Sequence, residues 1–371
     1  MRNKKIRVGV IGANPTRGWA RDTHIPILKY LPEYELVALA TSNESSASAA
    51  GKAFGVARVF GDFRQLLEEP DIDLAVVSVR APMHYELTAA AIDAGKHVTC
   101  EWPLGKNSAE TESLRAAAEK KGVLHMVGMQ GRGSPALNFV RDLVLQGRIG
   151  RVIAATLTQS LWVWGSPGTK SELYRNDVGN GNTALTISTA QAFDALCFCA
   201  GELKSVSALV KTTRPSAIAL DTGESVPMSA PDQVAIIGTM SEGGVASLHV
   251  KAGTGNPVGN RFEINGIDGD ILIESRVDDP PVGIHRANLT IKLARGAGGR
   301  YELLPVPDSY FLIPPDAFVN PAYNVAQLYR RFAKAFTTGV SPEPNFATAS
   351  MRRAALDKIQ RASDTGLAQE L

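Results

Sequence analysis

Between residues 6 and 130, short runs rich in β-branched residues alternate with alanine-rich amphipathic stretches, and this alternation limits the possible folds more than any other feature. The apolar runs, in order, are IRVGVIG, ELVALAT, DLAVVSV, HVTCE and VLHMVGMQ. Strands that alternate with helix-length amphipathic segments are typical of βαβ units, whose parallel strands form one sheet with helices on both faces. Residues 1–130 are therefore predicted to form an α/β domain with a doubly wound parallel sheet.

The pattern changes after about residue 150, where longer alternations of apolar and polar residues are divided by Gly, Asp and Pro turns. The main runs are RVIAATLTQSLWVWG, VAIIGTM, GVASLHVKAG, RFEINGIDGDILIES and ANLTIKLA. Because a period of two predicts half-buried strands, residues 131–371 are expected to form an α+β domain with a large, mainly antiparallel sheet. Two helices are predicted near the end, each stopped by a glycine, and we expect them to pack back on the first domain.

The composition is that of a soluble globular protein with a small-molecule partner. Of 371 residues, 44% are hydrophobic and 20% are charged. No apolar run reaches the about 18 residues that a membrane span needs. The 39 basic and 37 acidic residues leave a net charge of +2, which gives no electrostatic reason to expect nucleic acid or a membrane as partner.

Cysteine and histidine usage indicates neither disulfides nor a metal. Cys100, Cys197 and Cys199 lie in apolar segments without CxxC or metal spacing, a pattern typical of reduced, buried thiols, and this predicts a cytoplasmic location. The six histidines show no metal-ligand spacing. The N-terminal apolar run reaches a glycine turn too early for a signal peptide and is interpreted as the first strand.

A glycine turn follows that first strand, in VGVIGANPTRGWA. A strand-to-helix turn of this kind presents backbone N–H groups and a helix dipole to a pyrophosphate. Asn14 takes the place of the second glycine of G-x-G-x-x-G and the loop is one residue longer, so a tight turn that binds nothing is the alternative. Arg17 favours the phosphate interpretation because it adds a formal charge. The predicted cofactor-binding residues here are Gly12, Ala13, Asn14, Thr16, Arg17 and Gly18.

The second strand is expected to end where the cofactor ribose is bound. NAD-specific sites carry an Asp or Glu at this point, whereas this chain has Thr41, Ser42 and Asn43. Without an acid, a 2′-phosphate is not repelled, so NADP is slightly favoured over NAD. No arginine in this loop strengthens that preference.

Several stretches identify a family resemblance that covers nearly the whole chain. They are RGWARDTHIPIL, VVSVRAPMHYE, CEWPLG, MQGRGSP, LYRNDVGNG and YNVAQLYRRF. The chain resembles the glucose-fructose oxidoreductase and inositol dehydrogenase family (Gfo/Idh/MocA), and within it most resembles the fungal galactose-pathway regulators. The resemblance implies a Rossmann-type NAD(P)-binding domain, a sugar-like substrate in carbohydrate metabolism, and a homodimer or homotetramer whose subunits meet at the face of the second domain's sheet.

The resemblance also implies a catalytic set, and this chain departs from it at all three positions. Family enzymes carry Glu-Lys-Pro after the fifth strand and Asp-x-x-x-His on a helix of the second domain. Here Trp102, Ile187 and Gln191 stand at the lysine, aspartate and histidine positions. Because none of these side chains accepts a proton near neutral pH, the ordinary mechanism of the family is not expected.

Further cofactor contacts are expected at the ends of the fourth and fifth strands. They are Val79, Arg80, His84, Glu101 and Trp102. His24 is also placed near the cofactor loops by the resemblance. Trp102 either lays its indole face beside the nicotinamide or a sugar, or fills space where strand meets helix. His84 either lies beside the cofactor or is a hydrogen-bonded residue at a helix start.

The predicted substrate-binding residues are Trp102, Arg132, Trp162, Tyr174 and Gln191. Tyr174 is the weak catalytic candidate, since its ordinary pKa near 10 would need strong tuning, and packing is its alternative. Lys106 is interpreted as a solvated helix-start lysine. Trp162 and Trp164, two apart on an expected strand, are predicted to point to one face and either stack on a sugar or lie at a subunit interface or in the core. For Arg132 the alternative is a plain salt bridge.

Two functions are compatible with this pattern. The first is an NAD(P)-dependent oxidoreductase that acts on a sugar or related polyhydroxy compound by a non-standard mechanism. The second is a catalytically inactive NAD(P)-binding sensor that regulates sugar metabolism through a protein partner. The substitution of all three catalytic positions favours the sensor. The absence of a partner motif in the sequence argues against it.

Overall fold

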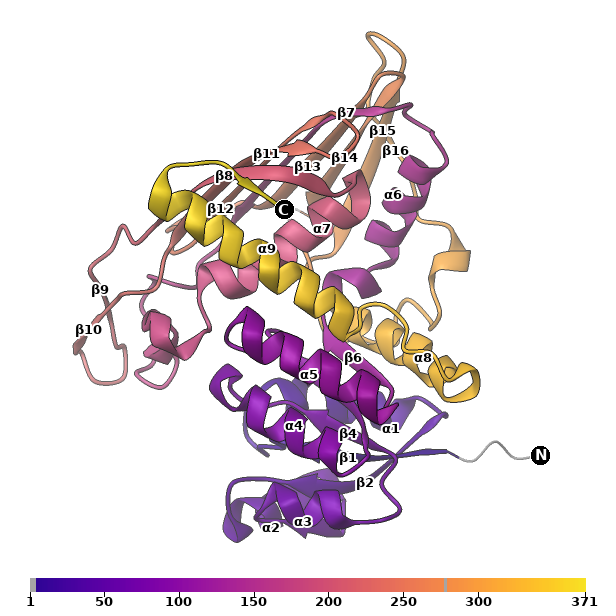
Figure 1. Cartoon of the computed structure of the whole chain (residues 1–371), viewed down its shortest axis with the longest axis vertical. Helices are drawn as coiled ribbons and strands as arrows, with labels where there is room; N and C mark the ends of the chain where they lie inside the picture. The colour runs from indigo at the N-terminus through magenta and orange to yellow at the C-terminus, as the bar shows by residue number, and fades with distance from the viewer. Residues whose placement is uncertain (1–4, 277–278) are drawn as a thin grey trace. The chain divides into compact units, whose positions relative to one another are not determined.

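The computed structural model describes residues 5–276 and 279–371. The chain forms two compact units (Figure 1). The first consists of the chain up to Met129 together with Ile313–Met351, and the second of Gln130–Leu312 together with Arg352–Leu371.

The first unit is built on a parallel sheet with the strand order β3-β2-β1-β4-β5-β6 in the part of the chain that the structure describes. The strands are β1 (Ile6–Ile11), β2 (Tyr34–Ala40), β3 (Arg58–Phe60), β4 (Leu74–Val77), β5 (His97–Glu101) and β6 (His125–Gly128). Every residue of β4 and β6 is buried, as expected for strands covered by helices on both faces. The predicted doubly wound sheet is confirmed, and its strand order reverses between β1 and β4.

Helices cover both faces of this sheet. They are α1 (Ile25–Tyr30), α2 (Glu44–Phe54), α3 (Phe63–Glu68), α4 (His84–Asp93), α5 (Ser108–Lys121) and α8 (Ala322–Thr338). The side-chain oxygens of Asn43 and Asn107 cap α2 and α5 by accepting backbone N–H groups, and Gly55 and Gly122 end the same helices in left-handed conformations. α4 and α5 lie side by side (Figure 1).

The second unit is built on a larger mixed sheet with the order β16-β15-β14-β13-β7-β12-β11-β8-β17 among the described residues. Its strands are β7 (Val152–Ser160), β8 (Leu203–Lys211), β11 (Gln233–Met240), β12 (Val245–Lys251), β13 (Gly259–Gly266), β14 (Gly269–Ser275), β15 (Leu289–Arg295), β16 (Glu302–Leu303) and β17 (Gln369–Glu370). The neighbours pair antiparallel except β7 and β12, which are parallel. The mainly antiparallel sheet is therefore confirmed.

The two faces of the larger sheet differ in burial. Helices α6 (Pro135–Leu145) and α7 (Ala190–Ala200) pack on one face (Figure 1), where Ile236 and Leu248 are buried. On the other face Leu209, Ile237 and Val245 remain about 60% exposed. A further helix, α9 (Phe346–Thr365), precedes β17 in the chain. None of the described helices is long and apolar enough to cross a membrane.

A small two-stranded sheet extends from the second unit (Figure 1). It pairs β9 (Ser216–Ile218) with β10 (Ser225–Pro227). Leu173, Ala217 and Ala219 form a buried apolar cluster that joins this hairpin to the segment after β7, with Val226 packed against it. The hairpin therefore holds the loop that carries Tyr174.

Candidate functional site

The turn after β1 is one that only glycine fits. Gly12 has φ +99°, and a Cβ built there would lie 2.1 Å from the carbonyl oxygen of Ser78. Gly18 has φ +101°, with open space around the same position. The turn therefore brings the end of β1 against the end of β4 and leaves the far side of the loop open.

Asn14 organises the lengthened loop. Its side-chain oxygen Oδ1 accepts hydrogen bonds from the backbone N–H of Thr16 (2.9 Å) and of Arg17 (3.1 Å), and from Thr16 Oγ1 (3.0 Å). From its sequence alone, Asn14 was a departure that weakened the motif. The structure explains it, because an Asn-Pro pair of this kind closes a local turn with its own side chain.

The helix after this turn starts with a π-helical segment. Residues Ala20–His24 form a π-helical segment, η1, which continues into α1. Ser78, which follows β4 and faces Gly12, has a buried hydroxyl with no hydrogen-bond partner among the described residues. A buried orphan hydroxyl beside a glycine turn fits a ligand that brings hydrogen-bonding oxygens, as a dinucleotide does.

At the end of β2 the predicted ribose-binding residues are partly committed to local structure. Asn43 Oδ1 caps α2 by accepting the Ser46 N–H at 2.9 Å, and Thr41 Oγ1 donates to the Asn43 carbonyl at 3.0 Å. Ser42 is exposed. The nearby acid Glu44 accepts a hydrogen bond from Gly61 N–H, so the preference for NADP stays a prediction.

Glu101 and Trp102 come directly after β5. Glu101 Oε1 lies 3.0 Å from His24 Nε2, and the Glu101 carboxylate packs so close to Gly128 that a Cβ there would lie 2.4 Å from it. Trp102 is 6% exposed. Lys106, four residues later, lies 3.9 Å from Glu110 and is solvated, as expected.

Tyr329 of α8 contacts the other ring nitrogen of His24, in the interior of the first unit. Its hydroxyl lies 2.9 Å from His24 Nδ1, and Tyr34 donates a hydrogen bond to the Tyr329 carbonyl at 2.7 Å. Burial, followed by the nearby Tyr34 and Glu101, raises the pKa of Tyr329 well above its ordinary value. Sequence reasoning missed Tyr329 because it lies 305 residues from His24 and no local pattern connects them.

The His84 ring lies between the segments that follow β4 and β5. Nδ1 lies 2.6 Å from the Pro103 carbonyl oxygen, and Nε2 lies 3.1 Å from the Val79 carbonyl oxygen. Three predicted cofactor residues, Val79, His84 and Trp102, are thereby brought to one place in the first unit. Arg80 directly precedes the short helix η2 (Ala81–Met83) and is exposed.

In the second unit, the positions of the family's aspartate and histidine lie on one continuous helical stretch. Ile187 belongs to a second π-helical segment, η6 (Ala184–Thr189), and Gln191 to the first turn of α7. Gln191 Nε2 donates to Gln130 Oε1 at 2.9 Å, with both side chains buried. Gln191, which stands where the family resemblance implies a histidine, is thus hydrogen-bonded to a second amide side chain.

Tyr174 lies near the start of that stretch. Its hydroxyl accepts a hydrogen bond from Asn182 Nδ2 at 2.9 Å, and the indole of Trp164 donates to the Asn182 carbonyl at 3.2 Å. Asn182 thus connects two aromatic side chains, a link with no signal in the sequence beyond the run of Asn and Gly.

The prediction that Trp162 and Trp164 share one strand face is wrong. β7 ends at Ser160, so both residues lie in a loop. Trp164 has φ +58° and is buried, whereas Trp162 is 53% exposed. A left-handed bulky residue is rare, and the glycine that follows lets the chain turn there. Trp162 as a substrate residue stays a prediction.

Arg132 lies in the interior of the second unit. It is 5% exposed and forms two hydrogen bonds with Asp194, from Nε at 2.9 Å and from Nη2 at 2.8 Å. Its guanidinium also lies over the Phe198 ring. These contacts match the salt-bridge alternative and leave the guanidinium largely committed to the protein.

The described residues contain no group of three or more His, Cys, Asp or Glu side chains that could hold a metal ion. Cys100, Cys197 and Cys199 are free and buried. Burial raises the pKa of Cys197 to about 12. The Cys197 thiol is therefore a poor ligand and a poor nucleophile.

Two family models match the chain. An oxidoreductase family with an NAD-binding Rossmann fold matches residues 6–129, and the C-terminal domain of Gal80p matches residues 135–275. Dehydrogenase aclE of Aspergillus oryzae is 32% identical over 59% of this chain and 62% of its own. The galactose/lactose metabolism regulatory protein GAL80 of Saccharomyces cerevisiae is 27% identical over 72% of this chain and 66% of its own. The chain thus matches somewhat less than two thirds of these curated relatives.

A sugar dehydrogenase is also similar. Levoglucosan dehydrogenase of Pseudarthrobacter phenanthrenivorans is 28% identical over 63% of each chain. A solved structure of levoglucosan dehydrogenase in complex with NADH and levoglucosan has a TM-score of 0.84, with 22% identity, and covers 99% of both chains. This likeness shows that the fold is shared along the whole length.

Proposed function

The chain belongs to the Gfo/Idh/MocA family of NAD-binding oxidoreductases, and on that premise we propose that it transfers a hydride between a nicotinamide cofactor and a sugar-like polyhydroxy compound. The observation that carries the proposal is the cluster at the carboxyl edge of the parallel sheet. Gly12, the orphan hydroxyl of Ser78, and Trp102 come there from three neighbouring strands. In open α/β sheets, ligands bind outside the carboxyl ends of the strands, where the strand order reverses.

Different residues of the first unit would bind different parts of the cofactor. The loop of Asn14, with Arg17 and the open Gly18, would hold the pyrophosphate, and Ser78 would donate to an oxygen of the cofactor. The bound nicotinamide supplies the hydride acceptor or donor. Trp102 has no proton to exchange near neutral pH, so it shapes the site and excludes water. The absence of an acid in Thr41–Asn43 supports NADP, which direct comparison of the two dissociation constants tests.

The first experiment is a single-turnover assay with protein in excess over NADP or NAD, against sugars, sugar lactones and inositols. We expect the nicotinamide absorbance to change with at least one compound. Quenching of tryptophan fluorescence in the same samples establishes whether the cofactor binds. If it binds and the absorbance changes with none of the compounds, the result would contradict oxidoreductase activity.

Tyr174→Phe should lower the single-turnover rate by about 10² or more while leaving the cofactor dissociation constant unchanged, because the phenol is the proton-carrying group proposed for the second unit. The Asn182 amide donates a hydrogen bond to the phenol oxygen and so fixes its position. Stopped-flow absorbance measures the rate. Tyr310→Phe is the matched control, since Tyr310 donates to Asp142 elsewhere in the same unit. An unchanged rate in Tyr174→Phe would remove this residue from the mechanism.

A regulatory function is the second candidate, and two observations favour it. Trp102, Ile187 and Gln191 stand where the family resemblance implies the catalytic residues, and residues 135–275 match the Gal80p C-terminal domain. In this alternative the same dinucleotide binds without turnover and changes the affinity for a protein partner. Cofactor binding combined with silence in the turnover assay is the result that selects it.

We also propose that two subunits associate through the open face of the larger sheet. Leu209, Ile237 and Val245 are exposed there, and apolar side chains gathered on a surface of this kind usually mark association. Ile237→Glu should shift the protein toward the monomer in light scattering coupled to size-exclusion chromatography, because it places a charge inside the contact.

The control for that variant is Ile267→Glu. Ile267 is exposed to the same extent, 59%, but lies in the turn between β13 and β14. It should leave the mass unchanged. Equal masses for wild type and Ile237→Glu at all concentrations would argue against this interface.

A further inference from the structure

The imidazole of His84 lies between two backbone carbonyls and is 2% exposed. Nδ1 faces the Pro103 oxygen at 2.6 Å, and Nε2 faces the Val79 oxygen at 3.1 Å. A neutral imidazole has one N–H and one lone pair, so it could donate to only one of these oxygens and would turn its lone pair toward the other. The imidazolium has two N–H groups and donates to both.

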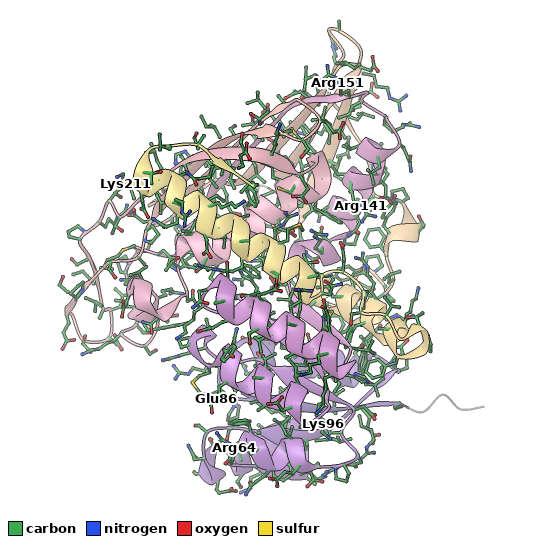
Figure 2. The ribbon with its side chains drawn as sticks, viewed as in Figure 1. Arg64, Glu86, Lys96, Arg141, Arg151 and Lys211 are labelled. Carbon is green, nitrogen blue, oxygen red and sulfur yellow. The ribbon has the colours of Figure 1, made fainter. Side chains whose placement is uncertain are left out.

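Few other groups act on this ring. Cys100 on β5 is the titratable side chain that acts on it most, and its thiol donates a hydrogen bond to the Glu101 carbonyl at 3.4 Å. Of the charged residues on adjoining turns, Arg80 is exposed and Glu86 pairs with Arg64 at 3.0 Å (Figure 2). Burial lowers the pKa of His84, but Cys100 and the two carbonyls outweigh burial and raise the pKa to about 9.

The position of His84 in the sheet indicates which part of a dinucleotide it faces. Val79 and Pro103 follow β4 and β5, on one side of the strand-order reversal, whereas the glycine turn follows β1 and the ribose-reading loop follows β2. A dinucleotide lies across such a reversal with one mononucleotide half on each side. The adenosine half belongs to β1 and β2, so the nicotinamide half belongs to β4 and β5.

We propose that His84 is held as a buried cation that distinguishes the two redox forms of the cofactor, favouring the reduced, uncharged nicotinamide ring over the oxidised, positively charged one. The inference rests on the proposed binding of a nicotinamide dinucleotide. Two like charges in a partly buried site repel each other enough to change a ratio of dissociation constants by on the order of tenfold. His84 thus biases the bound cofactor toward the form that reduces a substrate.

The test compares the dissociation constants of NADP+ and NADPH, and of NAD+ and NADH, for wild type and His84→Gln at neutral pH by isothermal titration calorimetry. The oxidised form should bind relatively better in the variant, so that the ratio of oxidised to reduced dissociation constants falls about tenfold. A residue with a merely structural role would weaken both forms alike and leave the ratio unchanged.

Two control variants separate charge from packing. His125 is also buried in the first unit, but burial lowers its pKa to about 4 and its Nδ1 accepts the Phe346 N–H, so it is neutral at neutral pH. His125→Gln should therefore keep the wild-type ratio. Cys100→Ala should keep the wild-type ratio at mildly acidic pH, but because Cys100 raises the pKa of His84, the ratio should fall at a lower pH than in wild type. A higher ratio in Cys100→Ala would mean that a thiolate neutralises the imidazolium, and would overturn the proposal.

A pH titration of the wild type decides the question if His84→Gln does not fold. The cation exists below the raised pKa, so the ratio should be constant near neutral pH and fall as the pH rises through about 9. Nitrogen NMR of labelled histidine should show both His84 nitrogens protonated at neutral pH. One unprotonated nitrogen overturns the inference, and so does a folded His84→Gln with an unchanged ratio. Failure of wild type to bind either redox form instead overturns the proposed function.

Discussion

Replacing Asp194 with alanine should lower the free energy of unfolding of the second unit by about 3–5 kcal/mol, because two buried guanidinium groups would lose their shared carboxylate. Asp194 is 2% exposed and accepts hydrogen bonds from Arg132 and, at 2.7 Å, from Arg352 Nε. Arg352 is itself 1% exposed. Without the acid, two buried guanidinium groups lack the carboxylate that they share, although Arg352 keeps its pairing with Glu202.

Urea denaturation and calorimetry of Asp194→Ala measure this loss. Glu202→Ala is the matched control, since Glu202 accepts two hydrogen bonds from Arg352 at 2.6 Å but is 48% exposed. Water can replace its carboxylate, so Glu202→Ala should cost only about 1 kcal/mol. An Asp194→Ala protein that unfolds like Glu202→Ala would contradict the buried-charge argument.

The same network predicts an acid-sensitive increment of stability. Burial acts to raise the pKa of Asp194, but Arg352 and Arg132 outweigh it and the pKa lies below its ordinary value. A carboxyl with a lowered folded-state pKa contributes stability above its unfolded pKa of about 4 and loses it as the pH falls through the folded value. Wild type should lose this increment below about pH 4, whereas Asp194→Ala has none to lose.

Gly12→Ala should have the second large effect, on stability and on cofactor binding together. An alanine at φ +99° is strained by about 1–3 kcal/mol, and its Cβ would lie 2.1 Å from the Ser78 carbonyl oxygen. The ends of β1 and β4 must move apart to relieve that contact. Because they frame the proposed pyrophosphate site, we expect the cofactor affinity to fall by more than about tenfold, for at least about 1.4 kcal/mol of lost binding.

Gly18→Ala separates the two causes. Gly18 has nearly the same φ, +101°, but a Cβ there meets nothing within 4 Å. Gly18→Ala therefore introduces the backbone strain but not the steric clash. It should lower the free energy of unfolding clearly less than Gly12→Ala does. Thermal unfolding and fluorescence titration with NADPH measure both quantities. Equal losses for the two variants would show that the contact with Ser78 has no energetic weight.

The first sheet could be predicted because its strands are buried on both faces, and β4 therefore reads as an unbroken apolar run. β3 was missed because its three residues, Arg58–Phe60, are too short to show a period. The end of β7 was placed too late because the apolar residues Leu161 to Trp164, which favour strands, extend the run past the point where the chain leaves the sheet. Periodicity reports side-chain polarity and not backbone direction.

The site was predictable where it depends on adjacent residues and not where it depends on contacts between distant ones. Gly12 is identified by its place after a strand. The ion pair of Arg132 with Asp194 and the contact of His24 with Tyr329 join residues 62 and 305 positions apart. A single sequence gives each residue's chemistry but not its neighbours, so it left Arg132 open between a substrate-binding cation and a plain salt bridge.

The contact between Tyr329 and His24 also bears on how the chain is made. The first unit includes Ile313–Met351, so its early residues are synthesised long before the segment that covers them. Domains generally fold from the N-terminus as they leave the ribosome. Here His24 and Tyr34 gain their contacts with Tyr329 only after a further 305 and 295 residues have been synthesised. A fragment that stops at the boundary of the parallel sheet would therefore be an incomplete folding unit, prone to chaperone capture or degradation rather than a self-sufficient nucleotide-binding module.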